Sequence, residues 1–356
     1  MFMRRIIGLL MMVGVVGFVG CGGDKDSSTG PSEETTKWRK DLGEGFANSV
    51  QQTVDGGFIV TGFNYGTGYL FLLKTDGQGN EEWKKTFEGG EGNSVQQTVD
   101  GGFIVAGWED WERSEGLLLK TDGQGNQEWR KTFGVGVGRS VQQTADDGFI
   151  ITGGYVGFLL KTDDQGNQKW RKTIEVVGQC KSVQQTVDGG FVVTGYHDND
   201  DNDYSEDYGL FLLKTDGQGN EEWRKNFGEG WGKSVQQTVD GGFVITGYDF
   251  DQEKDDGGFL LKTDGQGNEE WRKNLGGTSP NAIQQTVDGG FIVTGQDLPF
   301  HVFLLKTDGQ GNEEWREKFQ PGEGFSVQQT ADGEFVVTGH EFYDIFLLKT
   351  NGLGNI

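Results

Sequence analysis

The chain has 356 residues, including 63 Gly, two Cys and three His, and its formal net charge is -24. This acidic balance argues against nucleic acid as a partner, because binding to phosphates needs clustered Lys and Arg. Glycine without a three-residue period excludes collagen, and two Cys exclude both a disulfide framework and a zinc cluster built on cysteines.

The N-terminus has the pattern of a secretory signal. Two Arg precede an apolar stretch over residues 6–20, which has the length of a signal's hydrophobic region and is short for a membrane span. The stretch ends in the sequence FVGC, which resembles the lipobox of bacterial lipoproteins. The resemblance implies that residues 1–20 are removed and that Cys21 is lipidated. A plain signal peptide followed by an incidental Cys is the alternative.

Residues 21–37 form a segment with almost no apolar side chains, which is typical of a flexible tether. Several acyl chains on Cys21 would hold the protein at a membrane, since each buried CH₂ group contributes about 0.8 kcal/mol. We therefore expect a membrane-anchored lipoprotein of the bacterial cell envelope, either periplasmic or exposed at the surface.

Residues 38–356 contain one sequence unit written seven times. The string VQQT, or IQQT in one unit, begins at Val50, Val95, Val141, Val183, Val235, Ile283 and Val327. An Asp-Gly turn, a run such as FIVTG, a variable stretch, a run such as FLLKT and a segment with Trp follow each string. Four short strand-like runs per unit, Gly-rich turns and no helical periodicity predict an all-β fold, a seven-bladed β-propeller with four antiparallel strands per blade.

The polarity of the four runs indicates their order within a blade. FIVTG and FLLKT are nearly continuous apolar runs, as expected of strands covered on both faces. VQQT and the Trp segment are more polar and fit the two edges. Because Arg or Lys next to Trp discourages edge-to-edge aggregation, the Trp strand belongs outside and VQQT belongs beside a central channel.

The two ends of the repeat region complement each other. Residues 38–42 form a Trp strand before the first VQQT, and the chain stops at Ile356, where the last Trp strand would begin. We expect residues 38–42 to pair with the strand that contains Leu347 and Leu348, to complete the last blade and to close the ring. The alternative, an open solenoid, would leave both terminal blades exposed.

The sequence FLLKTDGQGNEEW resembles the repeats of quinoprotein-like propellers, a group that includes WD40-like and YVTN-like repeats. Asp76, Gly79 and Trp83 occupy the places of the Asp, Gly and Trp that those repeats share. The segment is also similar to the Asp-box turns of sialidases. The resemblance covers residues 38–356 and implies a blade type. Quinoprotein enzymes usually have eight blades, and many of their alcohol dehydrogenases carry adjacent Cys, so we expect no cofactor of that kind here.

The turns after the first and third strands of each repeat have nearly constant sequences and lie on one face of the ring. The loops after the second and fourth strands vary in sequence and lie on the other face, which we call the candidate recognition face. The longest and most acidic loops belong to neighbouring repeats and contain Asp198, Asp200, Asp203, Asp249 and Asp251. These carboxylates are candidate calcium ligands, although an EF-hand would need Gly and Glu at places where this sequence lacks them. A solvated acidic loop and a site for a cationic partner are the alternatives.

Aromatic residues outside the repeat pattern gather in the same variable loops. Exposed Tyr and Trp suit a protein interface or the stacking of sugars, so they are candidate ligand-binding residues. We name five of them for this role: Trp108, Trp111, Tyr204, Tyr208 and Trp231. The alternative is that these side chains pack against one another and shield the end of the ring.

Catalytic patterns are scarce in the chain. His197, His301 and His340 stand singly, no nucleophile motif is present, and Cys180 has no partner once Cys21 is lipidated. A monomeric, lipid-anchored module that binds a protein or a glycan, or acts as a scaffold, is therefore the predicted function. A propeller enzyme, either a glycan-active hydrolase or lyase or a quinoprotein-like oxidoreductase, is the alternative, and cell-surface adhesion is a third.

Overall fold

The computed structural model describes residues 37–110, 115–198, 208–250 and 257–356. Within these ranges the chain consists of β-strands joined by turns, without a helix, which confirms the all-β class. The strands are β1 (Trp38–Gln52), β2 (Phe58–Asn64), β3 (Tyr69–Thr75), β4 (Glu81–Phe87), β5 (Glu91–Gln97), β6 (Phe103–Asp110), β7 (Glu115–Thr121), β8 (Gln127–Val135), β9 (Gly138–Gln143), β10 (Phe149–Gly153), β11 (Val156–Thr162), β12 (Gln168–Gln185), β13 (Phe191–Asp198), β14 (Tyr208–Thr215), β15 (Glu221–Gln237), β16 (Phe243–Asp249), β17 (Gly257–Thr263), β18 (Glu269–Asn274), β19 (Thr278–Gln285), β20 (Phe291–Asp297), β21 (His301–Thr307), β22 (Glu313–Pro321), β23 (Glu323–Gln329), β24 (Phe335–Glu341) and β25 (Asp344–Thr350).

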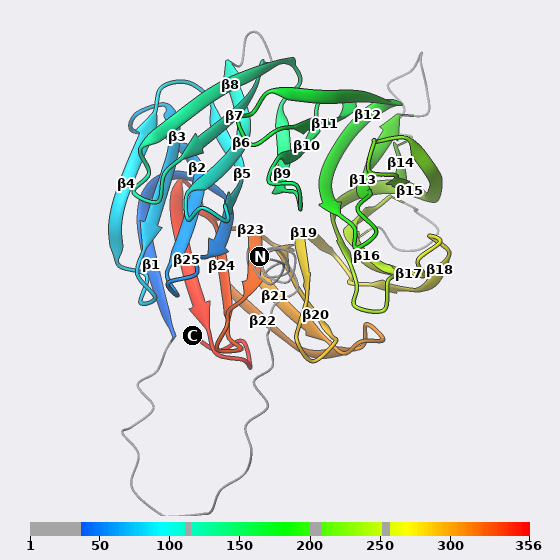
Figure 1. The fold of residues 1–356 in the computed structure, drawn as a ribbon. Coiled ribbons are helices and arrows are strands. Elements are labelled where there is room, and N and C mark those ends of the chain that lie inside the picture. The colour runs from blue at the N-terminus through cyan, green and yellow to red at the C-terminus, as the bar shows by residue number, and fades with distance from the viewer. Residues whose placement is uncertain (1–36, 111–114, 199–207, 251–256) are drawn as a thin grey trace, which may run out of the picture.

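Hydrogen bonds join the strands into four-stranded antiparallel units, such as β5-β6-β7-β8 and β19-β20-β21-β22. The long strands β1, β12 and β15 pass from one unit to the next. The first half of β12, for example, pairs with β11 and its second half pairs with β13. We call the segments with VQQT or IQQT the inner strands; they are β5, β9, β19, β23 and the second halves of β1, β12 and β15. Figure 1 shows the units side by side around a common centre.

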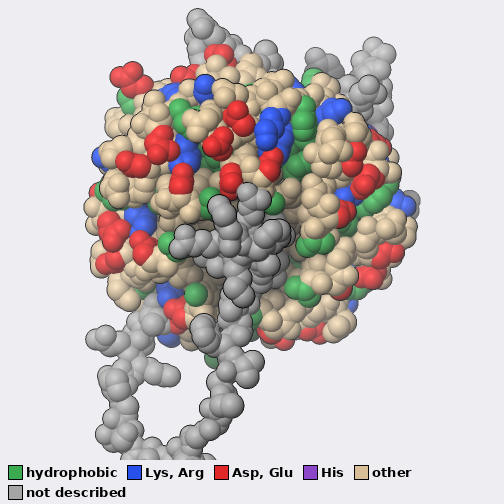
Figure 2. Space-filling model, viewed as in Figure 1, with side chains coloured by type: hydrophobic (Ala, Val, Ile, Leu, Met, Phe, Trp, Pro, Cys, Tyr) green, Lys and Arg blue, Asp and Glu red, His purple; other side chains and the backbone are tan. Residues whose placement is uncertain are grey.

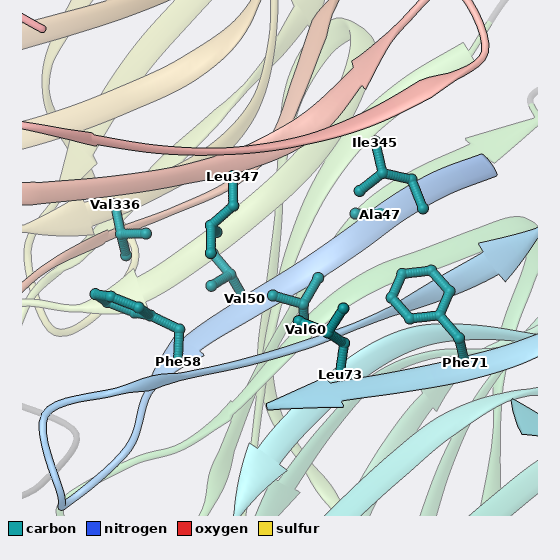
Figure 3. Packing of buried hydrophobic residues seen from close by; sticks show 9 residues of the cluster. All are labelled: Ala47, Val50, Phe58, Val60, Phe71, Leu73, Val336, Ile345 and Leu347. Atoms are coloured by element: carbon teal, nitrogen blue, oxygen red, sulfur yellow. The ribbon is translucent and has the colours of Figure 1, made fainter. Parts of the chain in front are cut away.

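The first half of β1 pairs with β25, near the other end of the chain. Trp38 lies opposite Lys349, and Lys40 lies opposite Leu347. The N-terminal strand thereby completes the sheet β23-β24-β25, as the unmatched segment 38–42 predicts. Side chains from both ends share one core (Figure 3), made of Ala47, Val50, Phe58, Val60, Phe71, Leu73, Val336, Ile345 and Leu347.

The Trp of each unit packs on the next unit. Trp38 meets Phe58 edge-on, with ring centroids 5.7 Å apart. Trp38 also covers Gly79, where φ is +74° and an added Cβ would lie 2.5 Å from the indole, so only Gly fits. In the same turn the Asp76 carboxylate accepts a hydrogen bond from the backbone N–H of Asn80 at 2.8 Å. The repeated DGQGN segment is therefore a structural turn.

The FLLKT-type strands are buried on both faces, as predicted, and the Lys that each of them contains is buried with a carboxylate partner. Lys74 is 4% exposed, and its Nζ lies 3.0 Å from both Asp55 Oδ2 and Glu82 Oε2. The same Nζ donates to the Thr75 carbonyl at 2.8 Å. Contacts of this type define what we call the repeat lysines: Lys74, Lys120, Lys161, Lys214, Lys262, Lys306 and Lys349.

Candidate binding site

A cavity of about 260 Å³ lies between the inner strands, at the place expected for a central channel. The first Val (or Ile) and Gln of all seven VQQT-type segments line it. These residues are Val50, Gln51, Val95, Gln96, Val141, Gln142, Val183, Gln184, Val235, Gln236, Ile283, Gln284, Val327 and Gln328.

The two Gln of each VQQT segment link neighbouring units. The Gln51 side-chain oxygen accepts a hydrogen bond from the Gln97 N–H at 2.5 Å, and the Gln97 side-chain oxygen accepts one from the Val54 N–H at 2.9 Å. The bond from a Gln backbone N–H to the Gln side chain of the preceding unit recurs between successive units. It also occurs between the last and first repeats, where the Gln52 N–H donates to the Gln328 side chain at 2.6 Å. The repeated channel amides therefore join neighbouring units to one another.

Each inner strand has a β-bulge two residues before its Val or Ile. A bulge leaves one residue without a partner across the ladder and re-aims its side chain. Because every inner strand runs toward a constant turn, the bulges lie at the opposite end of the channel, on the side of the variable loops. We call this end the mouth. The bulged residues are Asn48, Asn93, Arg139, Lys181, Lys233, Asn281 and Phe325.

Three bulged residues from consecutive repeats are basic, and we call Arg139, Lys181 and Lys233 the mouth cations. Burial, reinforced by the charges of Arg139 and Lys233, lowers the pKa of Lys181 to about 6. Burial also lowers the pKa of Lys233, while Glu323 of the last repeat acts in the opposite direction. The inner strands that carry the mouth cations are neighbours: the Val183 N–H donates to the Ser140 hydroxyl and the Val235 N–H donates to the Ser182 hydroxyl, each at 3.3 Å, so the three bulges lie side by side at the mouth.

The mouth cations lack the carboxylates that pair the repeat lysines. Within the described residues no ion pair engages any of the three, and the Nε of Arg139 is buried without a hydrogen-bond partner. Lys181 donates to the neutral Gln179 side-chain oxygen at 2.7 Å. The ammonium groups of Lys181 and Lys233 lie 5.4 and 5.5 Å from the ring centroids of Tyr196 and Trp231.

Two carboxylates near the mouth are bound to neutral bulge residues. The Asn48 side-chain amide donates to Glu91 at 2.6 Å, and the Asn281 amide donates to Glu323 at 2.8 Å. The Trp108 indole N–H also donates to Glu91, at 3.3 Å. The structure therefore places the predicted binding residue Trp108 beside the mouth, next to Glu91, whose charge also acts on the mouth cation Arg139 and opposes the lowering of its pKa by burial.

Five aromatic side chains form a cluster that reaches the mouth cations through Tyr196 and Trp231, and we call them the mouth aromatics: Tyr196, Tyr208, Trp231, Tyr248 and Phe250. Ring centroids lie 5.8 Å apart for Tyr208 and Trp231, 5.6 Å for Tyr196 and Trp231, and 4.8 Å for Trp231 and Phe250. The structure thus brings together Tyr208 and Trp231 of the predicted set. It adds Tyr196, Tyr248 and Phe250, which sequence reasoning missed; Tyr196 and Tyr248 directly follow the TG of a recurring strand and so do not stand out from the repeat.

The acidic loops fall largely outside the described ranges. Asp198 ends β13, and its side chain is not described. Asp249 forms an ion pair with Arg272 at 2.8 Å. The ranges that the structure describes contain no group of three His, Cys, Asp or Glu that could hold a metal, so the calcium site stays a prediction. The predicted site residues outside the described ranges are Cys21, Trp111, Asp200, Asp203, Tyr204 and Asp251.

The candidate catalytic residues Cys180, His301 and His340 do not form a shared site. Cys180 is fully buried, and burial raises the pKa of its thiol to about 12, which disfavours a nucleophilic thiolate. His340 packs against Phe46 and Phe325, with ring centroids 4.6 and 5.3 Å away. His301 lies at the start of β21, in another unit.

Comparison with known proteins identifies the fold. The crystal structure of the WD40 β-propeller domain of Doa1 superposes with a TM-score of 0.66 at 10% sequence identity, covering 90% of this chain and 98% of that one. No family model and no curated protein matches the sequence. The chain thus has the fold of a WD40 β-propeller. Among its described residues no helix is long and apolar enough to span a membrane.

Proposed function

We propose that this chain is a binding or scaffolding module that holds a protein or a glycan at its variable loop face. Polar groups that recur in the repeats, such as the repeat lysines and the channel amides, bond to the protein itself. Of the mouth aromatics, Tyr208, Trp231 and Phe250 depart from the repeat. The cluster around Trp231 is the observation that carries the proposal, because part-exposed Trp and Tyr dominate binding surfaces.

Affinity capture from a bacterial envelope extract tests this function. The bait is the chain from residue 21 with Cys21→Ser, which carries no lipid. We expect the Trp231→Ala bait to lose a ligand that the parent bait retains. The control is Val239→Ala, which removes an exposed side chain at a constant turn. Equal capture by all three baits would contradict the role of the mouth, and unfolding curves verify that each bait is folded.

We infer further that the propeller has seven blades and that its ring is closed. The pairing of β1 with β25 supports closure. Bonds that link successive units also occur between the last and first repeats: Val50 N–H donates to the Ser326 hydroxyl at 3.2 Å, and Ala331 N–H donates to the Gln52 side chain at 2.8 Å. Deleting residues 38–42 should therefore abolish the cooperative unfolding of the domain.

The lipid anchor and the cellular location of the protein are part of the same proposal. The lipobox-like sequence before Cys21 supports a lipid anchor in the bacterial envelope, with residues 21–37 as the tether that carries a monomeric propeller. Labelling of cells with a radioactive fatty acid tests this directly. The wild-type chain should take up label, and Cys21→Ser should not; label in the variant would contradict the assignment.

A further inference from the structure

The mouth cations occupy positions that the fold does not require to be basic. The same bulge holds Asn in three other repeats, at Asn48, Asn93 and Asn281, and Phe in the last. Asn48 and Asn281 use their amides to bond neighbouring carboxylates. Folding of the inner strand therefore does not explain why three consecutive repeats carry a positive charge at this point.

The three mouth cations lie at one end of the channel, and none has a carboxylate of the described residues within ion-pair distance, so they oppose folding when they are charged. Burial of a charge without a partner is unfavourable, and like charges repel one another. The repeat lysines show the contrast, since they are buried as well, yet each contacts at least one carboxylate. The missing negative charge at the mouth is one that a ligand would supply.

We propose that Arg139, Lys181 and Lys233 bind a compact oxyanion, the carboxylate, phosphate or sulfate group of a ligand that enters the channel mouth. The inference rests on the proposed binding function and adds the chemistry of the ligand. The Trp231 indole N–H is buried without a hydrogen-bond partner among the described residues and provides a further donor beside the cations. The mouth aromatics then accommodate the uncharged part of the ligand.

The charge of the whole molecule restricts the ligand further. The chain carries -24 in total, and Figure 2 shows Asp and Glu side chains spread over the visible face, with Lys and Arg between them. An extended polyanion would meet repulsion along this surface. A small ligand with one anionic group, or an anionic end group of a longer neutral one, reaches the mouth cations without that penalty.

Titration calorimetry on the purified chain tests the site with four probes: sulfate, phosphate, glucuronate and uncharged glucose. Each mouth cation is replaced by Asn, the residue that the fold already accepts at this bulge. We expect at least one anion to bind and Lys233→Asn to weaken it by about tenfold or more, the loss expected for a charged hydrogen bond. The control Lys131→Asn removes an exposed cation from outer strand β8 and should change nothing.

The probes also separate the sources of the anion. Preference for glucuronate over sulfate and phosphate identifies a carboxylate ligand, and the reverse preference identifies a phosphate or sulfate ester. Absence of heat with all three anions at millimolar concentration, or equal binding by wild type and the Arg139→Asn, Lys181→Asn and Lys233→Asn variants, would overturn the inference. Failure of this test would leave a ligand captured from envelope extract unaffected, so the two proposals fail separately.

Discussion

Two sets of basic side chains lie inside this propeller, and they differ in what surrounds them. Lys306, one of the repeat lysines, has carboxylate oxygens of Asp288 and Glu314 each 2.9 Å from its Nζ. Lys233, one of the mouth cations, lies over an indole ring instead. We therefore expect the paired lysines to stabilise each repeat and the mouth cations to reduce stability. A buried basic side chain without a carboxylate partner is therefore a better indication of a ligand site than a buried basic side chain in an ion pair.

The largest effect is expected when a repeat lysine loses its charge. Lys306→Met leaves Asp288 and Glu314 without their cation, and it should lower the free energy of unfolding by about 2 kcal/mol, since water reaches both carboxylates and softens the loss. Urea unfolding monitored by Trp fluorescence measures the change. The exposed Lys131→Met serves as the control. An unchanged urea midpoint for Lys306→Met would contradict the claim that the repeat lysines stabilise the fold.

The opposite sign is expected at the mouth. Lys233→Asn removes a charge that has no carboxylate partner, so it should raise the free energy of unfolding by about 1 kcal/mol. The same urea experiment measures this variant beside Lys306→Met. If both variants are destabilised alike, the mouth cations are structural and the distinction between the two sets disappears.

The third prediction is a dependence of stability on pH. The pKa of Lys181 is lowered to about 6 in the folded chain, with Arg139 on β9 and Lys233 on β15 as the charges that face it. Between this value and the ordinary lysine pKa, the unfolded chain binds the proton that the folded chain lacks, so stability rises with pH. The stability of wild type relative to Lys181→Asn should therefore increase from about pH 6 to about pH 9. A flat difference would contradict the lowered pKa.

Much of the fold follows from the sequence because repetition multiplies a weak local signal. The recurrence of VQQT fixes where each unit begins, and the unmatched segment 38–42 predicts the pairing with β25 that the structure contains. The burial of Lys74 was not predicted, because a Lys after two Leu looks like the end of an apolar run. Its partners Asp55 and Glu82 stand on other segments, and only the folded sheet brings them together.

The candidate site was predicted less completely. Tyr208 and Trp231 stood out because they interrupt the repeat, and the structure places them in contact. Arg139, Lys181 and Lys233 carry a signal in the sequence, since each precedes a recurring Ser-Val-Gln-Gln string where other repeats have Asn or Phe. What the sequence does not contain is the bulge at each of these three positions, because a bulge is defined by pairing with the next strand.

Thermal unfolding with and without sulfate tests the central claim most directly, because a ligand that binds only the folded chain raises its Tm. Wild type is compared with the triple variant that carries Arg139→Asn, Lys181→Asn and Lys233→Asn, at ionic strength matched with sodium chloride. The account predicts a higher Tm for the triple variant without sulfate, and a rise on adding sulfate for wild type alone. A triple variant of lower Tm that still responds to sulfate as wild type does would contradict it.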